Sequence, residues 1–126
     1  MVGIVIVSHS ENLAKSVVEL AHMMAPTAKF APAGGLEDGT FGTSFERVQA
    51  AIESICSDDG VVVLMDMGSA VMTTEMVLEM MPDKKVVMAD CPLVEGAVTA
   101  AADAAGNMPL EKIMKDLSSL FTTHKF

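Results

Sequence analysis

The chain begins Met1-Val-Gly-Ile-Val-Ile-Val-Ser-His9-Ser10, and this stretch sets the pattern for the whole molecule. Val2 to Val7 form an apolar, largely β-branched run with one glycine, which predicts a buried strand. A polar Ser-His-Ser triplet follows directly, and the sequence then takes helical spacing. Open α/β folds place their chemistry just beyond the carboxyl ends of parallel strands. His9 is therefore the first candidate for a functional residue.

Strand-like apolar runs alternate with helix-like segments along the whole chain. The sequence predicts strands over 2–7, 28–31, 61–65 and 84–89, and helices over 10–25, 43–56, 69–81, 93–105 and about 109–121. Crossovers of this length demand parallel strands. We therefore predict an α/β, doubly wound fold: a mainly parallel four-stranded sheet in the order 2-1-3-4, with helices on both faces and a C-terminal helix. The order is that of the commonest small doubly wound folds.

Length, composition and charge limit what the chain can be. With 126 residues, 51% of them hydrophobic, it is large and apolar enough for a single domain over 1–126. A formal net charge of −9 without any basic patch argues against nucleic acid and anionic membranes as partners. No apolar run approaches the roughly 20 residues of a membrane helix, and the N-terminus lacks the basic start of a signal peptide. We expect a cytoplasmic protein.

His9 and Asp66 together meet the needs of a phosphorylated histidine. One ring nitrogen must be unprotonated and exposed, while the other keeps its proton toward a fixed acceptor. A carboxylate is a good acceptor, because it selects the tautomer and stabilises charge on the ring. Asp66 follows the predicted strand 61–65, and the order 2-1-3-4 places it across from His9, where the winding reverses. Alternatively, Asp66 only caps the next helix, and His9 is structural.

Backbone N–H groups are the expected donors to the phosphoryl oxygens. The helix that starts at Ser10 and the helix that starts at Gly68 and Ser69 each offer free amides and the positive end of a dipole. Gly35, in the glycine-rich loop 32–42, would let the backbone approach the same anion. This loop matches neither the P-loop nor the dinucleotide fingerprint, and we expect no bound cofactor.

The sulfur-containing residues add nothing to this site. Cys56 and Cys91 match no metal-ligand spacing, which predicts free buried thiols and no metal centre. Met72, Met76 and Met80 recur every fourth residue and are expected to fill a core or an interface. An apolar chain this rich in methionine and alanine is expected to bury a helix face in a homodimer.

Four segments resemble one known family in the right order: VSHSENLA (7–14), AGGLEDGTFGTS (33–44), LMDMGSAVMTTE (64–75) and ADCPLVEGA (89–97). They are similar to the phosphotransferase subunits of bacterial dihydroxyacetone kinases, in the mannose-type enzyme IIA family of the phosphoenolpyruvate-dependent phosphotransferase system (PTS). The resemblance implies a phosphotransferase with a phosphohistidine intermediate, in which His9 Nε2 accepts the phosphoryl group from the histidine phosphocarrier protein HPr. It also implies onward transfer to ADP on a nucleotide-binding subunit, DhaL, and a homodimer.

Two other functions are weighed against this one. A response-regulator-like signalling domain would be phosphorylated on Asp66, but it needs an acidic pair after the first strand to hold Mg²⁺, where this chain has Ser-His-Ser. A non-enzymatic regulatory domain would use His9 only structurally. The chemistry of labelling separates the three: phosphohistidine is labile in acid and stable in base, an acyl phosphate is cleaved by hydroxylamine, and a regulatory domain takes no label.

Overall fold

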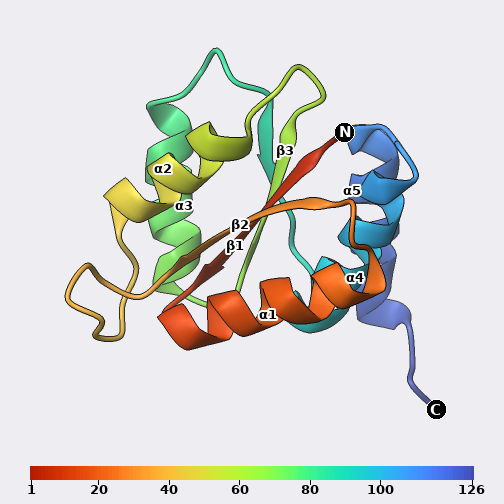
Figure 1. Cartoon of the computed structure of the whole chain (residues 1–126), viewed down its shortest axis with the longest axis horizontal. Coiled ribbons are helices and arrows are strands. Elements are labelled where there is room, and N and C mark those ends of the chain that lie inside the picture. Colours follow the sequence, from red (N-terminus) through yellow and green to blue (C-terminus); the bar gives the residue numbers. More distant parts are fainter.

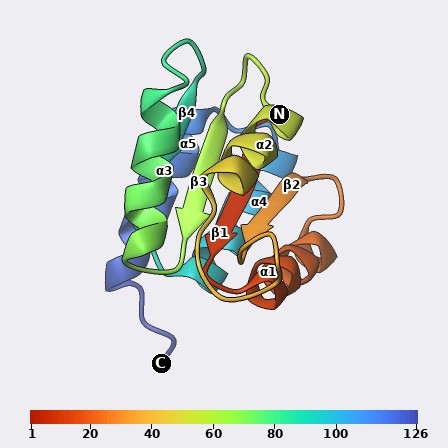
Figure 2. The same ribbon diagram turned by 90° about the vertical axis from the view of Figure 1, so that its left-hand side faces the viewer.

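The computed structural model describes residues 1–126 and places one parallel sheet between two layers of helices (Figure 1). The strands are β1 (Gly3–Ser8), β2 (Lys29–Gly34), β3 (Val61–Met65) and β4 (Val86–Met88). Their order is β2-β1-β3-β4, and every neighbouring pair is parallel. Figure 2 shows the arrows of β1, β2 and β3 pointing the same way. The predicted fold class and strand order are confirmed.

Five helices cover the two faces of the sheet: α1 (Glu11–Met24), α2 (Phe45–Ile55), α3 (Ser69–Glu79), α4 (Leu93–Ala105) and α5 (Leu110–Ser118). Helices α1, α4 and α5 pack on one face, and α2 and α3 pack on the other (Figure 1). A 3-10 turn over Ser119–Thr122 extends α5, which confirms the predicted C-terminal helix. None of these helices combines the length and the apolar character that crossing a bilayer requires.

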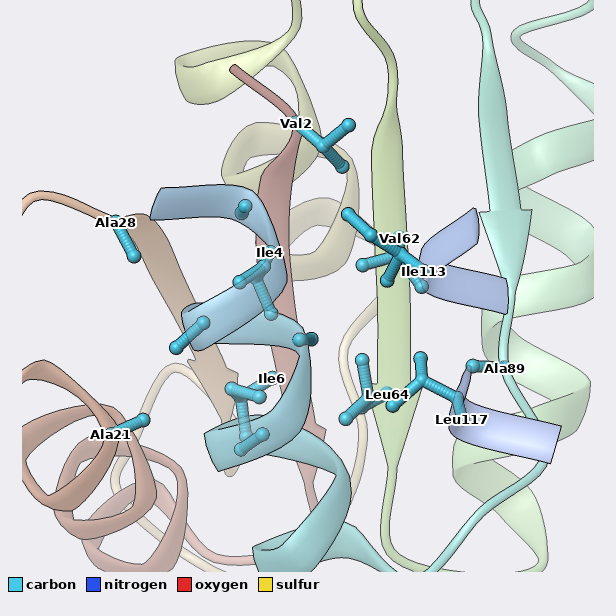
Figure 3. Close-up of a cluster of buried hydrophobic side chains, with 14 of the residues drawn as sticks. Val2, Ile4, Ile6, Ala21, Ala28, Val62, Leu64, Ala89, Ile113 and Leu117 are labelled. Carbon is cyan, nitrogen blue, oxygen red and sulfur yellow. The ribbon is translucent and has the colours of Figure 1, made fainter. Parts of the chain in front are cut away.

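The two central strands are buried on both sides, which explains their unbroken apolar runs. Successive side chains of a strand point to opposite faces. Ile4, Ile6 and Leu64 therefore lie in the core beneath α1, α4 and α5 (Figure 3). Val5 and Val63 lie in the second core, beneath α2 and α3. Packing on both faces fixes the ends of β1 and β3, where the candidate residues lie.

Two strand boundaries differ from the prediction. The sequence predicts a loop from residue 32, but β2 continues to Gly34, because an edge strand tolerates Pro32. The sequence predicts a strand over 84–89, but β4 has only three residues. Lys84 belongs to the preceding turn, where its amide donates to the carbonyl of Met81 (3.1 Å). Neither difference moves His9 or Asp66.

The sulfur-containing side chains are more exposed than the sequence predicts. Met72, Met76 and Met80 are 67%, 56% and 68% exposed on α3, so the prediction that they fill the core of this chain is wrong. The other expectation for these methionines, burial in an interface with a second chain, stays a prediction. Cys56 and Cys91 are free, as predicted, but only partly buried. The core side of α3 is instead made of small or β-branched residues: Ala70, Thr74 and Val77.

Candidate functional site

His9 and Asp66 follow the ends of two neighbouring strands. Val7 of β1 pairs in parallel register with Met65 of β3, and His9 and Asp66 lie just beyond that pair. The Asp66 amide donates to the carbonyl of Val7 (3.1 Å), which holds Asp66 beside the end of β1. His9 Nδ1 lies 2.9 Å from Asp66 Oδ1. The structure therefore brings together the two residues that the predicted strand order places side by side.

The carboxylate of Asp66 accepts four hydrogen bonds. Oδ2 accepts from the Ser8 hydroxyl (2.8 Å) and the His9 amide (2.9 Å). Oδ1 accepts from His9 Nδ1 (2.9 Å) and the Met67 amide (2.7 Å). Burial by itself would raise the pKa of Asp66, but the hydrogen bonds outweigh it and hold this pKa below its ordinary value. An ionised carboxylate only accepts, so the ring proton of His9 sits on Nδ1.

The N-terminus of α3 has no side-chain cap, which excludes the alternative that Asp66 is its N-cap. Gly68 occupies the cap position, with φ 35° and ψ −102°, a conformation that favours glycine. The first turn of α3 contains no acidic residue. The amides of Gly68 and Ser69 donate to no protein atom. This helix end therefore presents two unused donors together with the positive end of its dipole.

His9 Nε2 faces that open helix end. Ser69 Oγ lies 2.5 Å from Nε2, and because Nδ1 carries the proton, the hydroxyl of Ser69 is the donor in this contact. The His9 side chain is 25% exposed, and none of the cavities of the structure is lined by His9. A partly exposed ring that lies outside every cavity suits a reaction with a large partner better than a reaction with an enclosed small molecule.

Two of the four predicted phosphate-binding residues, Ser10 and Gly35, have backbone amides that already donate within the protein. Ser10 is the N-cap of α1: its Oγ accepts from the Leu13 amide (3.2 Å), and its own amide donates to Ser8 Oγ (3.0 Å). The Gly35 amide donates to the carbonyl of Ser8 (3.1 Å). Neither the Ser10 amide nor the Gly35 amide is free for an anion. Of the four predicted positions, Gly68 and Ser69 keep free amides.

Ser8 belongs to the site, although the sequence pattern does not single it out. It is the last residue of β1, and its side chain is fully buried. Its hydroxyl contacts Asp66 Oδ2 and the Ser10 amide. The only signal in the sequence is a hydroxyl at the end of an otherwise apolar strand, which predicts the start of a turn equally well.

The geometry disfavours phosphorylation of Asp66. Each of its carboxylate oxygens already accepts two hydrogen bonds, so attack on phosphorus would break several of them. No three His, Cys, Asp or Glu side chains are grouped so that they could hold a metal ion, whereas a response-regulator-like domain needs such a group. The favoured nucleophile of this site is therefore His9 Nε2.

Comparison with known proteins places the chain in a family. The profile of the family EIIA-man, described as "PTS system fructose IIA component", matches residues 3–114. The chain belongs to this family. Within EIIA-man it groups with the DhaM subunits, because a DhaM protein of Lactococcus lactis is 40% identical over 118 residues that cover 94% of each chain. That relative is the phosphotransferase subunit DhaM of a PTS-dependent dihydroxyacetone kinase.

Other similar proteins differ in length. The phosphoryl donor subunit DhaM of a PEP-dependent dihydroxyacetone kinase from Escherichia coli is 41% identical over 123 residues, which cover 92% of this chain and 26% of that protein. The chain thus spans about a quarter of the E. coli relative. Among solved structures, a protein of unknown function is similar with a TM-score of 0.80 and 26% identity, over 92% of each chain.

Proposed function

We propose that this chain relays a phosphoryl group within a PTS-dependent dihydroxyacetone kinase. His9 Nε2 accepts the group from HPr and passes it to ADP on the nucleotide-binding subunit DhaL. One observation carries the proposal: His9 Nδ1 is fixed on Asp66, while Nε2 faces the uncapped N-terminus of α3. The names of relatives about 40% identical support the same function.

The first step transfers the group from HPr to His9. The lone pair of Nε2 attacks phosphorus in line with the N–P bond of the carrier's phosphohistidine. A new N–P bond forms at Nε2, the bond on the carrier breaks, and its electron pair stays on the carrier's imidazole. Asp66 stabilises the positive charge that develops on the His9 ring. The Ser69 hydroxyl leaves Nε2 by rotation of its side chain and then donates to a phosphoryl oxygen.

The second step transfers the group from His9 to ADP. A β-phosphate oxygen of ADP attacks phosphorus, the Nε2–P bond breaks, and its electron pair returns to Nε2, which leaves ATP on DhaL. The proton stays on Nδ1 throughout, so the ring needs no proton exchange with solvent. Between the two steps, the free amides of Gly68 and Ser69 hold the phosphoryl oxygens.

The relay needs no cofactor or metal of its own. We propose that HPr and DhaL supply the cations that the phosphoryl group needs during transfer, because this chain carries a formal net charge of −9 and has few cationic side chains. In the structure, the ring nitrogens of His9 contact Asp66 and Ser69, and neither of these residues is a cation. The acidic surface also supports the expectation that nucleic acid and anionic membranes are not partners.

The relay is tested with purified partners. The chain is incubated with labelled phosphoenolpyruvate, enzyme I and HPr, and is then chased with ADP and DhaL. We expect a label that is labile in acid and stable in base, followed by its transfer to ATP. A label that hydroxylamine removes would assign an acyl phosphate on Asp66. A chain that takes up no label would contradict the relay.

We also propose that the chain forms a homodimer. Met72, Met76 and Met80 form an exposed apolar row on α3, and burial against a second copy would remove these side chains from water. Light scattering at micromolar concentration should give twice the mass of the chain. A mass equal to that of one chain would contradict the dimer and leave the relay untouched, because His9 and Asp66 lie in one chain.

A further inference from the structure

We propose that Ser8 is a positioning residue for phosphoryl transfer, because its hydroxyl holds the Asp66 carboxylate in the orientation that keeps the ring proton of His9 on Nδ1. The proposal rests on the relay described above and adds to it a residue that touches neither the phosphoryl group nor the ring of His9. The contacts that carry it run from Ser8 in the core through Asp66 to the ring of His9.

Ser8 is one of three buried polar residues in the chain, with Ser44 and Thr74. A hydroxyl in a core costs stability unless its hydrogen-bonding capacity is satisfied. The Ser10 amide can only donate, so Ser8 Oγ is the acceptor in that contact (3.0 Å). The single hydrogen of the Ser8 hydroxyl is then directed at Asp66 Oδ2 (2.8 Å). The backbone thus fixes the direction of the whole chain of hydrogen bonds.

The contact at Oδ2 sets where Oδ1 points. The terminal torsion of an aspartate is soft, so the donors on its two oxygens decide how firmly the carboxylate is held. Two donors hold Oδ2 here, the Ser8 hydroxyl and the His9 amide. With Oδ2 fixed, Oδ1 faces His9 Nδ1 at 2.9 Å and also accepts from the Met67 amide (2.7 Å). Loss of the Ser8 hydroxyl therefore loosens the acceptor that selects the tautomer of His9.

The surroundings of Ser8 favour positioning over mere filling of space. Its side chain reaches the residue after β3 and the N-cap of α1, and its carbonyl accepts from Gly35 after β2. Ser8 thus joins the ends of three strands at the point where His9 begins. A purely structural hydroxyl would affect the stability of the fold and leave the His9 tautomer unchanged, which gives the test its readout.

The test compares Ser8→Ala, Ser8→Thr and, as a matched control, Ser44→Ala. Ser44 is also buried, and its hydroxyl caps α2 by accepting from the Arg47 amide (3.2 Å). Nitrogen-15 NMR reports the protonation of both ring nitrogens of His9 without any partner, and the rate of labelling by phosphorylated HPr reports transfer. We expect Ser8→Ala to lower the population protonated at Nδ1 and to slow transfer by about tenfold, the low end for loss of an outer partner of a functional residue.

The two other variants sharpen the outcome. Ser8→Thr, which keeps the hydroxyl, should restore the tautomer and the rate, and Ser44→Ala should lose stability while keeping both. A Ser8→Ala protein with the tautomer and rate of the unchanged chain overturns the proposal. If Ser8→Ala does not fold, Ser8→Cys keeps the size with a weaker donor, and an unchanged tautomer there overturns it equally. If the unchanged chain takes no label, the relay fails, and the NMR comparison decides the role of Ser8.

Discussion

The N-termini of α1 and α3 both lie at the carboxyl end of the sheet, but they are built in opposite ways. At α1, the Ser10 side chain caps the helix and Glu11 stands in the first turn. Glu11 is itself paired with Lys15 (3.0 Å) and Arg47 (3.6 Å). At α3, the cap position is Gly68, no side chain caps the first turn, and no acidic residue is present.

We propose that the start of α1 serves stability and that the start of α3 serves chemistry. The start of α1 has a side-chain cap and a carboxylate beside the positive end of the helix, and both stabilise the helix. The start of α3 leaves donors unpaired and its dipole uncompensated, at a cost in local stability. Such departures from good helix capping are expected where an anion must bind. His9 Nε2 faces the second kind of end.

Loss of His9 should have the largest effect. His9→Gln removes the nucleophile, and we expect labelling from phosphoenolpyruvate, enzyme I and HPr to fall below detection. His22, on α1, is a matched control, because its Nε2 is already bound to the carbonyl of Ala28 (2.8 Å). His22→Gln should be labelled as the unchanged chain is. Undiminished labelling of His9→Gln would place the reaction on another residue. The uncapped start of α3 would then have no role in the phosphorylation of His9.

Asp66→Asn should have the next largest effect. The asparagine side chain is uncharged and cannot replace the carboxylate as the charged acceptor for His9 Nδ1. We therefore expect transfer to slow by about tenfold or more, with the fold retained. The rate of labelling measures transfer, and circular dichroism spectra check that the fold is retained. Transfer as fast as in the unchanged chain would reduce Asp66 to a structural residue.

Ser69→Ala tests the open end of α3 directly. The variant keeps the free amides but removes the hydroxyl that contacts Nε2, and we expect transfer to slow by about tenfold, less than loss of a buried oxyanion donor causes. Labelling reactions quenched after different times measure the rate of transfer. An unchanged rate would mean that the hydroxyl of Ser69 only occupies Nε2 between transfers.

Ser10→Ala should have the smallest effect on transfer and a measurable effect on stability. Loss of the cap on α1 should lower the free energy of unfolding by about 1 kcal/mol. The rate of transfer should stay within about twofold, because the Ser10 amide and its bond to Ser8 remain. Urea denaturation and labelling measure the two quantities. If Ser10→Ala slows transfer as much as Ser69→Ala does, the two helix ends do not differ in function.

The sequence predicts the fold and the central pair of the site because both depend on local patterns. Apolar runs of strand length alternate with helical spacing, and this alternation leads to the parallel sheet. Once the strand order is set, the residues that follow β1 and β3 must meet. His9 and Asp66 were therefore accessible to prediction without any knowledge of side-chain contacts.

The sequence does not predict which backbone amides are free. Ser10, Gly35 and Gly68 all look like open donors by residue type. Whether an amide is used depends on tertiary contacts, such as those that both Ser10 and Gly35 make with Ser8. For a similar reason, the sequence does not predict that the methionines of α3 are exposed. A regular row of apolar residues fits a core and an outer face equally well.

The attachment of the phosphoryl group is the most direct test of this account. The chain is prepared with nitrogen-15 in its histidines and phosphorylated with phosphoenolpyruvate, enzyme I and HPr. Phosphorus and nitrogen NMR spectra then show which nitrogen is bonded to phosphorus. We predict a bond at His9 Nε2, on the side of the uncapped N-terminus of α3, with the proton retained on Nδ1. A bond at Nδ1, or on any residue other than His9, would contradict the account.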